Sequence, residues 1–133
     1  MKPQLQHVSI PRPPGSDEIT RQFYGGVLGL EEKPVPTSIT SFDLIWFFLT
    51  GNTELHVFAD NDTYGIKRNH FCLVVDDLDG TRQKIIDAGH EVDDAPTIFG
   101  RPRFFCRDPF GNQIEFTAIE DDYMKYQGQS SDE

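Results

Sequence analysis

Residues 104–117, FFCRDPFGNQIEFT, contain two short β-forming runs on either side of a turn. Phe104 begins the first strand, Pro109 and Gly111 supply turn residues, and residues 113–117 form the return strand. Ile114 and Phe116 share one face of that strand, which leaves Glu115 on the other. A carboxylate in the middle of a strand either faces water or needs a partner, because burying it unpaired is costly. The segment predicts a β-hairpin with one carboxylate on its polar face.

Outward from this hairpin, the same order of elements occurs twice. The first half reads as strand, helix, short strand and hairpin, over residues 5–10, 16–28, 31–35, 42–49 and 53–58. The second half repeats it over residues 69–76, 77–88, 91–93 and 104–117. This duplication predicts an α+β fold of two tandem βαβββ modules, about residues 4–60 and 68–119, in one domain over residues 1–119.

The remaining segment, residues 120–133, loses periodicity and is acidic. It predicts a mobile tail that contains at most a short helical turn.

Four side chains of metal-ligand type occupy matched strands of the two halves. His7 and His70 lie in the first strand of each half, and His56 and Glu115 lie in the last. Imidazole and carboxylate together suit a divalent transition metal such as Zn, Ni, Mn, Co or Fe, and the absence of thiolates argues against a closed structural zinc site. The pattern predicts a metal site with open positions for water or substrate.

Each of these residues also has a structural interpretation. His7 taken alone fits a half-exposed strand position, and His70 follows a basic pair and could simply begin a strand. His56 shares its strand face with Glu54, so a surface Glu-His pair is an alternative, and either residue could be the fourth ligand. His90 follows Gly89 and is expected to be exposed.

Charge and composition exclude several classes of function. The net charge of −10 over 133 residues argues against nucleic acid as a partner and would favour a cationic ligand. No segment is apolar enough to predict export or a membrane span. The two cysteines, Cys72 and Cys106, lack the spacing of a zinc cluster or a disulfide framework, which indicates a reduced, cytoplasmic protein.

Several segments resemble the vicinal oxygen chelate superfamily, which includes glyoxalase I, extradiol dioxygenases, fosfomycin-resistance transferases and bleomycin-resistance proteins. They are His7-Val8-Ser9-Ile10, FYGGVLGL at 23–30, the His70 strand with residues 75–79, and RDPFGNQIE at 107–115. The resemblance covers roughly residues 5–119. It implies a homodimer in which the two βαβββ modules of each chain form a cupped mixed sheet around a central metal or ligand site. By position, it implies His7, His70 and Glu115 as metal ligands, and it places His56 where a fourth ligand, usually Glu, is found.

These residues leave three functions open. The first is a metal-dependent enzyme of the glyoxalase or dioxygenase type, which chelates a small oxygenated molecule through the metal and uses Glu115 to move a proton. The second is a metal-free protein of the bleomycin-resistance kind that sequesters a cationic molecule, and the third is a fosfomycin-type thiol transferase. Four side chains are candidates for substrate binding, namely Trp46, Phe48, Arg101 and Arg103.

Overall fold

The computed structural model describes residues 2–61 and 69–129. The chain divides into two compact units: unit 1 is Met1–Ile66 with Pro109–Asn112, and unit 2 is Lys67–Asp108 with Gln113–Glu133. The start of the predicted second module at residue 68 and the end of the predicted tail, residues 130–133, lie outside the described residues.

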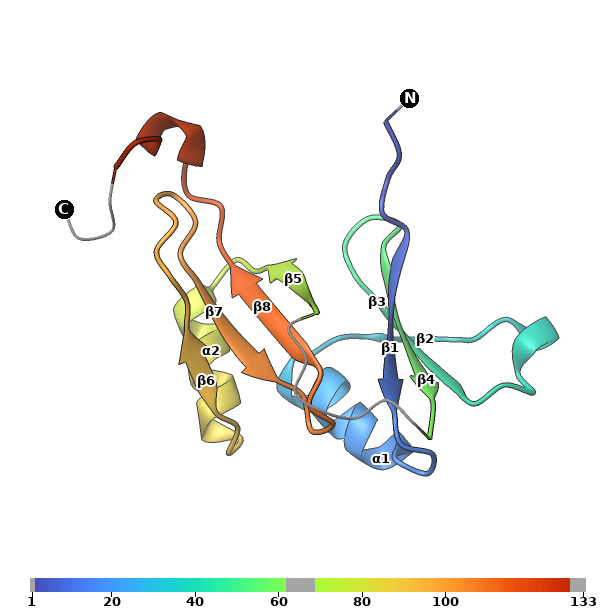
Figure 1. Cartoon of the computed structure of the whole chain (residues 1–133). Coiled ribbons are helices and arrows are strands. Elements are labelled where there is room, and N and C mark those ends of the chain that lie inside the picture. Colours follow the sequence, from blue (N-terminus) through green and yellow to red (C-terminus); the bar gives the residue numbers. More distant parts are fainter. Residues whose placement is uncertain (1, 62–68, 130–133) are drawn as a thin grey trace. The chain divides into compact units, whose positions relative to one another are not determined.

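Unit 1 is a four-stranded mixed sheet with helical turns between its strands (Figure 1). In chain order its elements are β1 (His7–Arg12), α1 (Asp17–Thr20), η1 (Arg21–Val27), β2 (Glu32–Lys33), η2 (Thr37–Ile39), β3 (Leu44–Phe48) and β4 (Glu54–Ala59). The strand order is β1-β4-β3-β2. β1 pairs in parallel with β4, whereas β3 is antiparallel to both of its neighbours.

Unit 2 repeats this topology. Its elements are β5 (His70–Val74), α2 (Leu78–Asp87), β6 (Val92–Asp94), β7 (Arg103–Arg107), β8 (Gln113–Thr117) and η3 (Tyr123–Tyr126). The strand order is β5-β8-β7-β6, with β5 parallel to β8 and the other pairs antiparallel. The predicted α+β fold of two βαβββ modules is therefore confirmed.

The first predicted helix differs in kind from an ordinary α-helix. After a single α-helical turn, α1, the chain continues as the π-helical segment η1. The amide of Leu28 donates to the carbonyl of Phe23, five residues earlier, at 2.9 Å. Gly25 and Gly26 lie inside this segment, and glycine is a poor α-helix former, so the wider turn meets little local resistance there.

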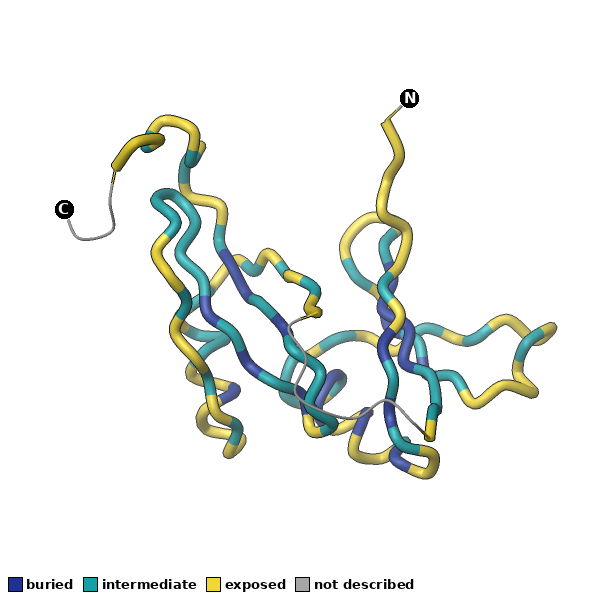
Figure 2. Tube along the Cα trace, in the orientation of Figure 1, coloured by how far each residue is buried: buried dark blue, intermediate teal, exposed yellow. Residues whose placement is uncertain are grey.

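Strand alternation gives each sheet two faces, and Figure 2 shows that buried and more exposed residues follow one another along the strands. One face forms the apolar core of its unit. In unit 1 the buried side chains include Ile10, Ile45, Phe47, Leu55 and Val57, together with Phe23 and Tyr24 from η1; in unit 2 they include Phe104, Cys106, Ile114 and Phe116, together with Ile85 from α2. The opposite faces carry the candidate ligands.

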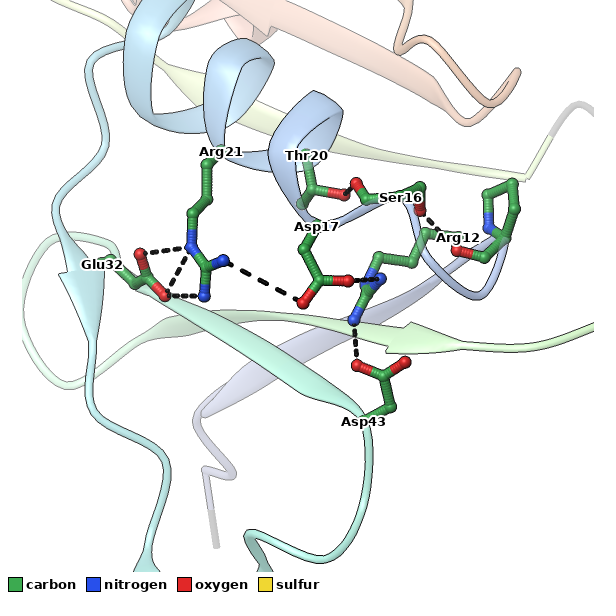
Figure 3. A network of polar contacts seen from close by, with 8 residues as sticks. Arg12, Ser16, Asp17, Thr20, Arg21, Glu32 and Asp43 are labelled. Carbon is green, nitrogen blue, oxygen red and sulfur yellow. Dashed lines mark hydrogen bonds and ion pairs between the residues drawn. The ribbon is translucent and has the colours of Figure 1, made fainter.

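An arginine at the end of β1 forms ion pairs with two aspartates of unit 1 (Figure 3). Arg12 is fully buried, and its guanidinium donates to Asp17 at 2.9 Å and to Asp43 at 2.6 Å. Its Nε has no hydrogen-bond partner among the described residues. Asp17 lies at the start of α1 and Asp43 immediately before β3, so Arg12 links three elements of the unit.

Candidate functional site

The register of the two sheets places the four candidate ligands in equivalent positions. In unit 1, His7 pairs with Glu54, and His56 lies two residues further along β4. In unit 2, His70 pairs with Gln113, and Glu115 lies two residues further along β8. Each unit therefore presents one diagonal pair on its polar face, His7 with His56 and His70 with Glu115.

In unit 1 the histidines form part of an aromatic stack. The His7 and His56 ring centroids are 4.1 Å apart with an interplanar angle of 14°. Trp46, from β3, stacks on His56 at 3.7 Å and 2°. The lone pair of an imidazole nitrogen lies in the plane of its ring, and these two planes are nearly parallel. In these rotamers the two rings do not direct their nitrogens toward a common point.

The two histidines of unit 1 also differ in which nitrogen is engaged. His7 Nδ1 is 2.7 Å from Gln6 Oε1, an acceptor, so Nδ1 carries the proton and Nε2 is the basic nitrogen. A partner of this kind is typical of metal-binding histidines. His56 Nε2 instead lies 2.9 Å from Glu54 Oε1. Of the two, His7 thus has the arrangement expected of a ligand.

Glu54 is a buried carboxylate held between two basic side chains. Its Oε2 accepts from Lys33, and its Oε1 contacts His56. The hydrogen bond from Lys33, followed by the one from His56, lowers the pKa of Glu54 to about 2. Burial lowers the pKa of His56, which favours its neutral form. Glu54 is thus an anion that fixes the orientation of the stacked ring.

The pair in unit 2 is more accessible. His70 Nε2 lies 3.0 Å from Glu115 Oε1, with side-chain exposures of 34% and 14%. Arg103 Nη1 is 3.5 Å from the same oxygen, while its Nε and Nη2 donate to the carbonyl of Pro96. Phe105 lies edge-on to His70 at 5.2 Å. Arg103 is therefore anchored by the loop before β7 and oriented toward Glu115.

Cys72 lies opposite Glu115 in the register, on the same polar face, although sequence reasoning assigned it no role in the site. Burial, together with the nearby Glu115 carboxylate, raises the pKa of the Cys72 thiol to about 12. A thiol with this pKa is a hydrogen-bond donor rather than a nucleophile at neutral pH. Strand alternation from His70 was the signal that could have placed Cys72 beside the candidate ligands.

The remaining predicted binding residues are dispersed. Phe48 is partly exposed, with the Lys33 ammonium 5.2 Å above its ring. Arg101 packs its guanidinium over Tyr123 at 4.6 Å. Of the four predicted binding residues, Trp46 stacks on a candidate ligand and Arg103 lies beside one. Lys33, which engages Glu54, was not foreseen because its partner lies 21 residues away, and Gln6, which engages its neighbour His7, had been assigned no role.

Within residues 2–61 and 69–129, no three His, Cys, Asp or Glu side chains form a group that could hold a metal ion. Each unit instead presents one diagonal pair.

None of the helices in the described part of the chain has the length and apolar character needed to traverse a bilayer.

Residues 4–116 match the model of the Glyoxalase/Bleomycin resistance protein/Dioxygenase superfamily. The chain belongs to this superfamily. A glyoxalase family protein from Bacillus anthracis is 34% identical, with a TM-score of 0.82 over 90% of this chain and 97% of that one. No curated protein sequence matches the chain significantly.

More distant solved structures share the fold. The antibiotic binding protein TnmS3 from Streptomyces is 19% identical, with a TM-score of 0.70 over 89% of this chain and 97% of that one. The fosfomycin resistance protein FosX from Listeria monocytogenes is 16% identical, with a TM-score of 0.71 over 89% and 92% of the two chains. Since these two proteins are described in different terms, the shared fold leaves the reaction open.

Proposed function

We propose that this protein is a divalent-metal-dependent enzyme that acts on a small oxygenated molecule, in the manner of glyoxalases or dioxygenases. The observation that carries the proposal is the repetition of one diagonal pair, His7 with His56 and His70 with Glu115, at equivalent register positions. All four equivalent positions therefore carry a side chain of metal-ligand type. The hydrogen bond from His7 to Gln6 supports His7 as a ligand.

The proposed ligands are His7, His70 and Glu115, a two-histidine, one-carboxylate set that suits Zn, Ni, Mn, Co or Fe. His56 is the candidate for a fourth ligand, for which its ring must leave the stack with Trp46. Glu54 is less suited, because Lys33 and His56 already engage both of its oxygens. The proposal requires a pair from each unit at one ion, supplied by one chain or by two chains of a homodimer.

In the proposed site, a bound cation, Glu115 and Arg103 would each act on a different part of the substrate. A bound divalent cation supplies Lewis acidity toward two neighbouring substrate oxygens. Glu115 has a carboxylate oxygen that can accept or return a substrate proton. Arg103, fixed by the Pro96 carbonyl, can orient an anionic group of the substrate next to Glu115.

The decisive test is the metal content of tag-free protein dialysed against trace mixed divalent metals. We expect about one metal ion per chain in the wild type and loss of most of it in His70→Ala and in Glu115→Ala. His90→Ala, which changes a histidine outside the two pairs, is the matched control and should retain the metal. His56→Phe keeps an aromatic ring in the stack; loss of metal in this variant would make His56 a ligand. A wild-type protein without metal would refute the proposal.

A second candidate function is metal-free binding of a cationic small molecule. The flat stack of Trp46, His56 and His7 supports it, as does the net charge of −10. One protein of the same fold is described as an antibiotic binding protein, and another as a fosfomycin resistance protein. Wild-type protein that holds no metal but binds a cationic aromatic drug, with the affinity lost in Trp46→Ala, would favour this candidate.

A further inference from the structure

A second candidate site lies in unit 2, between the loop that precedes β7 and the segment that contains η3. A cavity of about 330 Å³ opens there, lined by Ile98 and Phe99 from the loop and by Tyr123, Tyr126 and Gln127 from the tail. Its volume falls at the lower end of the range of about 300–1,000 Å³ that is usual for small-molecule sites. None of the four candidate metal ligands lines it.

Gly100 fixes the tail against the loop. Its carbonyl accepts from the amides of Glu120 at 2.8 Å and Asp121 at 3.1 Å. Gly100 has a φ of +83°, and a Cβ at this position would lie 2.8 Å from the carbonyl oxygen of Asp121. Only glycine therefore permits this backbone approach, and the position of the tail wall depends on it.

Three aromatic side chains line the cavity, and one of them packs against an arginine that is not itself part of the lining. The Phe99 and Tyr126 rings meet at 5.6 Å with an interplanar angle of 40°, which gives two adjoining π surfaces. Tyr123 carries the Arg101 guanidinium over its ring at 4.6 Å. The Tyr126 hydroxyl donates to Asp121 at 2.8 Å, which holds this ring in place and makes it more electron-rich. Electron-rich rings in this arrangement attract cations.

The segment beside the tail wall is acidic. Glu120, Asp121 and Asp122 precede η3, although none of them lines the cavity. Lys125 is itself paired with Asp121 at 2.9 Å. We infer that this cavity binds a small organic cation, specifically a methylated ammonium group packed against Phe99, Tyr123 and Tyr126. The inference does not depend on the metal site, so it can be tested on metal-free protein.

The test is calorimetric titration of the full chain with choline and with its neutral carbon isostere, 3,3-dimethylbutan-1-ol. If cation–π attraction provides the recognition, choline should bind about tenfold more tightly than the isostere. Tyr126→Leu and Phe99→Leu each remove a π surface but keep an apolar wall, and each should weaken choline binding several-fold. Tyr126→Phe keeps the ring and should bind choline within a few-fold of the wild type.

Met124→Leu changes an exposed side chain of η3 outside the cavity lining and serves as the control, with wild-type affinity expected. Thermal unfolding of every variant reports whether it is folded. The inference is overturned if choline and the isostere bind equally, if neither binds at millimolar concentration, or if folded Tyr126→Leu and Phe99→Leu both bind choline like the wild type.

Discussion

At the scale of single residues, Glu54 links stability to pH. Its folded-state pKa of about 2 lies below the ordinary 4.5, so its contribution is complete above about pH 4.5 and is lost as the pH falls toward 2. His56 adds to the loss below about pH 6.5, because burial lowers its pKa in the folded state. The folded state is therefore expected to lose stability as the pH falls below about 6.5 and further as it falls from about 4.5 toward 2.

The corresponding prediction is that Glu54→Gln is less stable than the wild type at pH 6 and loses less stability between pH 6 and pH 3. Urea unfolding followed by circular dichroism at several pH values measures both effects. Glu91→Gln, which changes an exposed carboxylate of unit 2, should follow the wild-type pH profile. An unchanged slope in Glu54→Gln would contradict the assignment of the acid sensitivity to Glu54.

A second prediction at this scale concerns Cys72. Cys72 is exposed as a residue, yet partial burial of its thiol and the nearby Glu115 raise the thiol pKa to about 12, so it should react slowly with iodoacetamide at pH 7.5. In metal-free Glu115→Gln, the rate at Cys72 should rise several-fold, whereas the rate at the buried Cys106 should not change. Mass spectrometry of digested protein separates the two sites. Equal rates at Cys72 in both proteins would exclude Glu115 as a cause.

At the scale of elements, the ion pairs of Arg12 with Asp17 and Asp43 connect β1, α1 and the chain just before β3. The guanidinium is fully buried, while Asp17 and Asp43 are each about half exposed. Removal of both carboxylates leaves an uncompensated buried charge, so the double variant Asp17→Asn with Asp43→Asn should lose about 3–5 kcal/mol. Arg12→Met removes the charge itself and should cost much less.

Urea unfolding at neutral pH compares these two proteins directly. The informative result is their order: if Arg12→Met is the less stable protein, Arg12 and its two partners stabilise the fold by ion pairing rather than by relief of a buried charge. Asp79→Asn, which changes an exposed carboxylate of α2, is the control and should stay near the wild type.

The order of helices and strands was the part of the structure that could best be predicted from the sequence. The repeated element order predicted both sheets and put the four candidate ligands in matched strands. The stack of Trp46 on His56 was not predictable, because it depends on the pairing register of β3 with β4 rather than on either strand alone. The burial of Arg12 escaped prediction for a similar reason, since Asp43 lies 31 residues away.

For the whole molecule, the proposed site divides its ligands between two units, which makes the number of chains per site testable. His7→Ala has an intact unit 2, and Glu115→Ala has an intact unit 1. If the protein is a homodimer whose sites are shared between chains, unfolding and refolding an equal mixture should restore about a quarter of the wild-type metal content. Sites within single chains should restore none.

Metal analysis of the refolded mixture, with each variant refolded alone as its control, distinguishes these cases. Light scattering on the same samples shows whether dimers are present at all. A monomeric wild type that binds one metal ion would refute the shared arrangement.

The separation of each sheet into an apolar and a polar face has an evolutionary consequence. The residues that hold each unit together and those proposed to do its chemistry occupy alternate positions of the same strands, so a slip of one residue would exchange them. Selection for a stable core therefore keeps the chemical positions in register. The side chains at those positions remain free to vary, so new binding properties can arise by substitution on the polar face while the architecture is inherited unchanged.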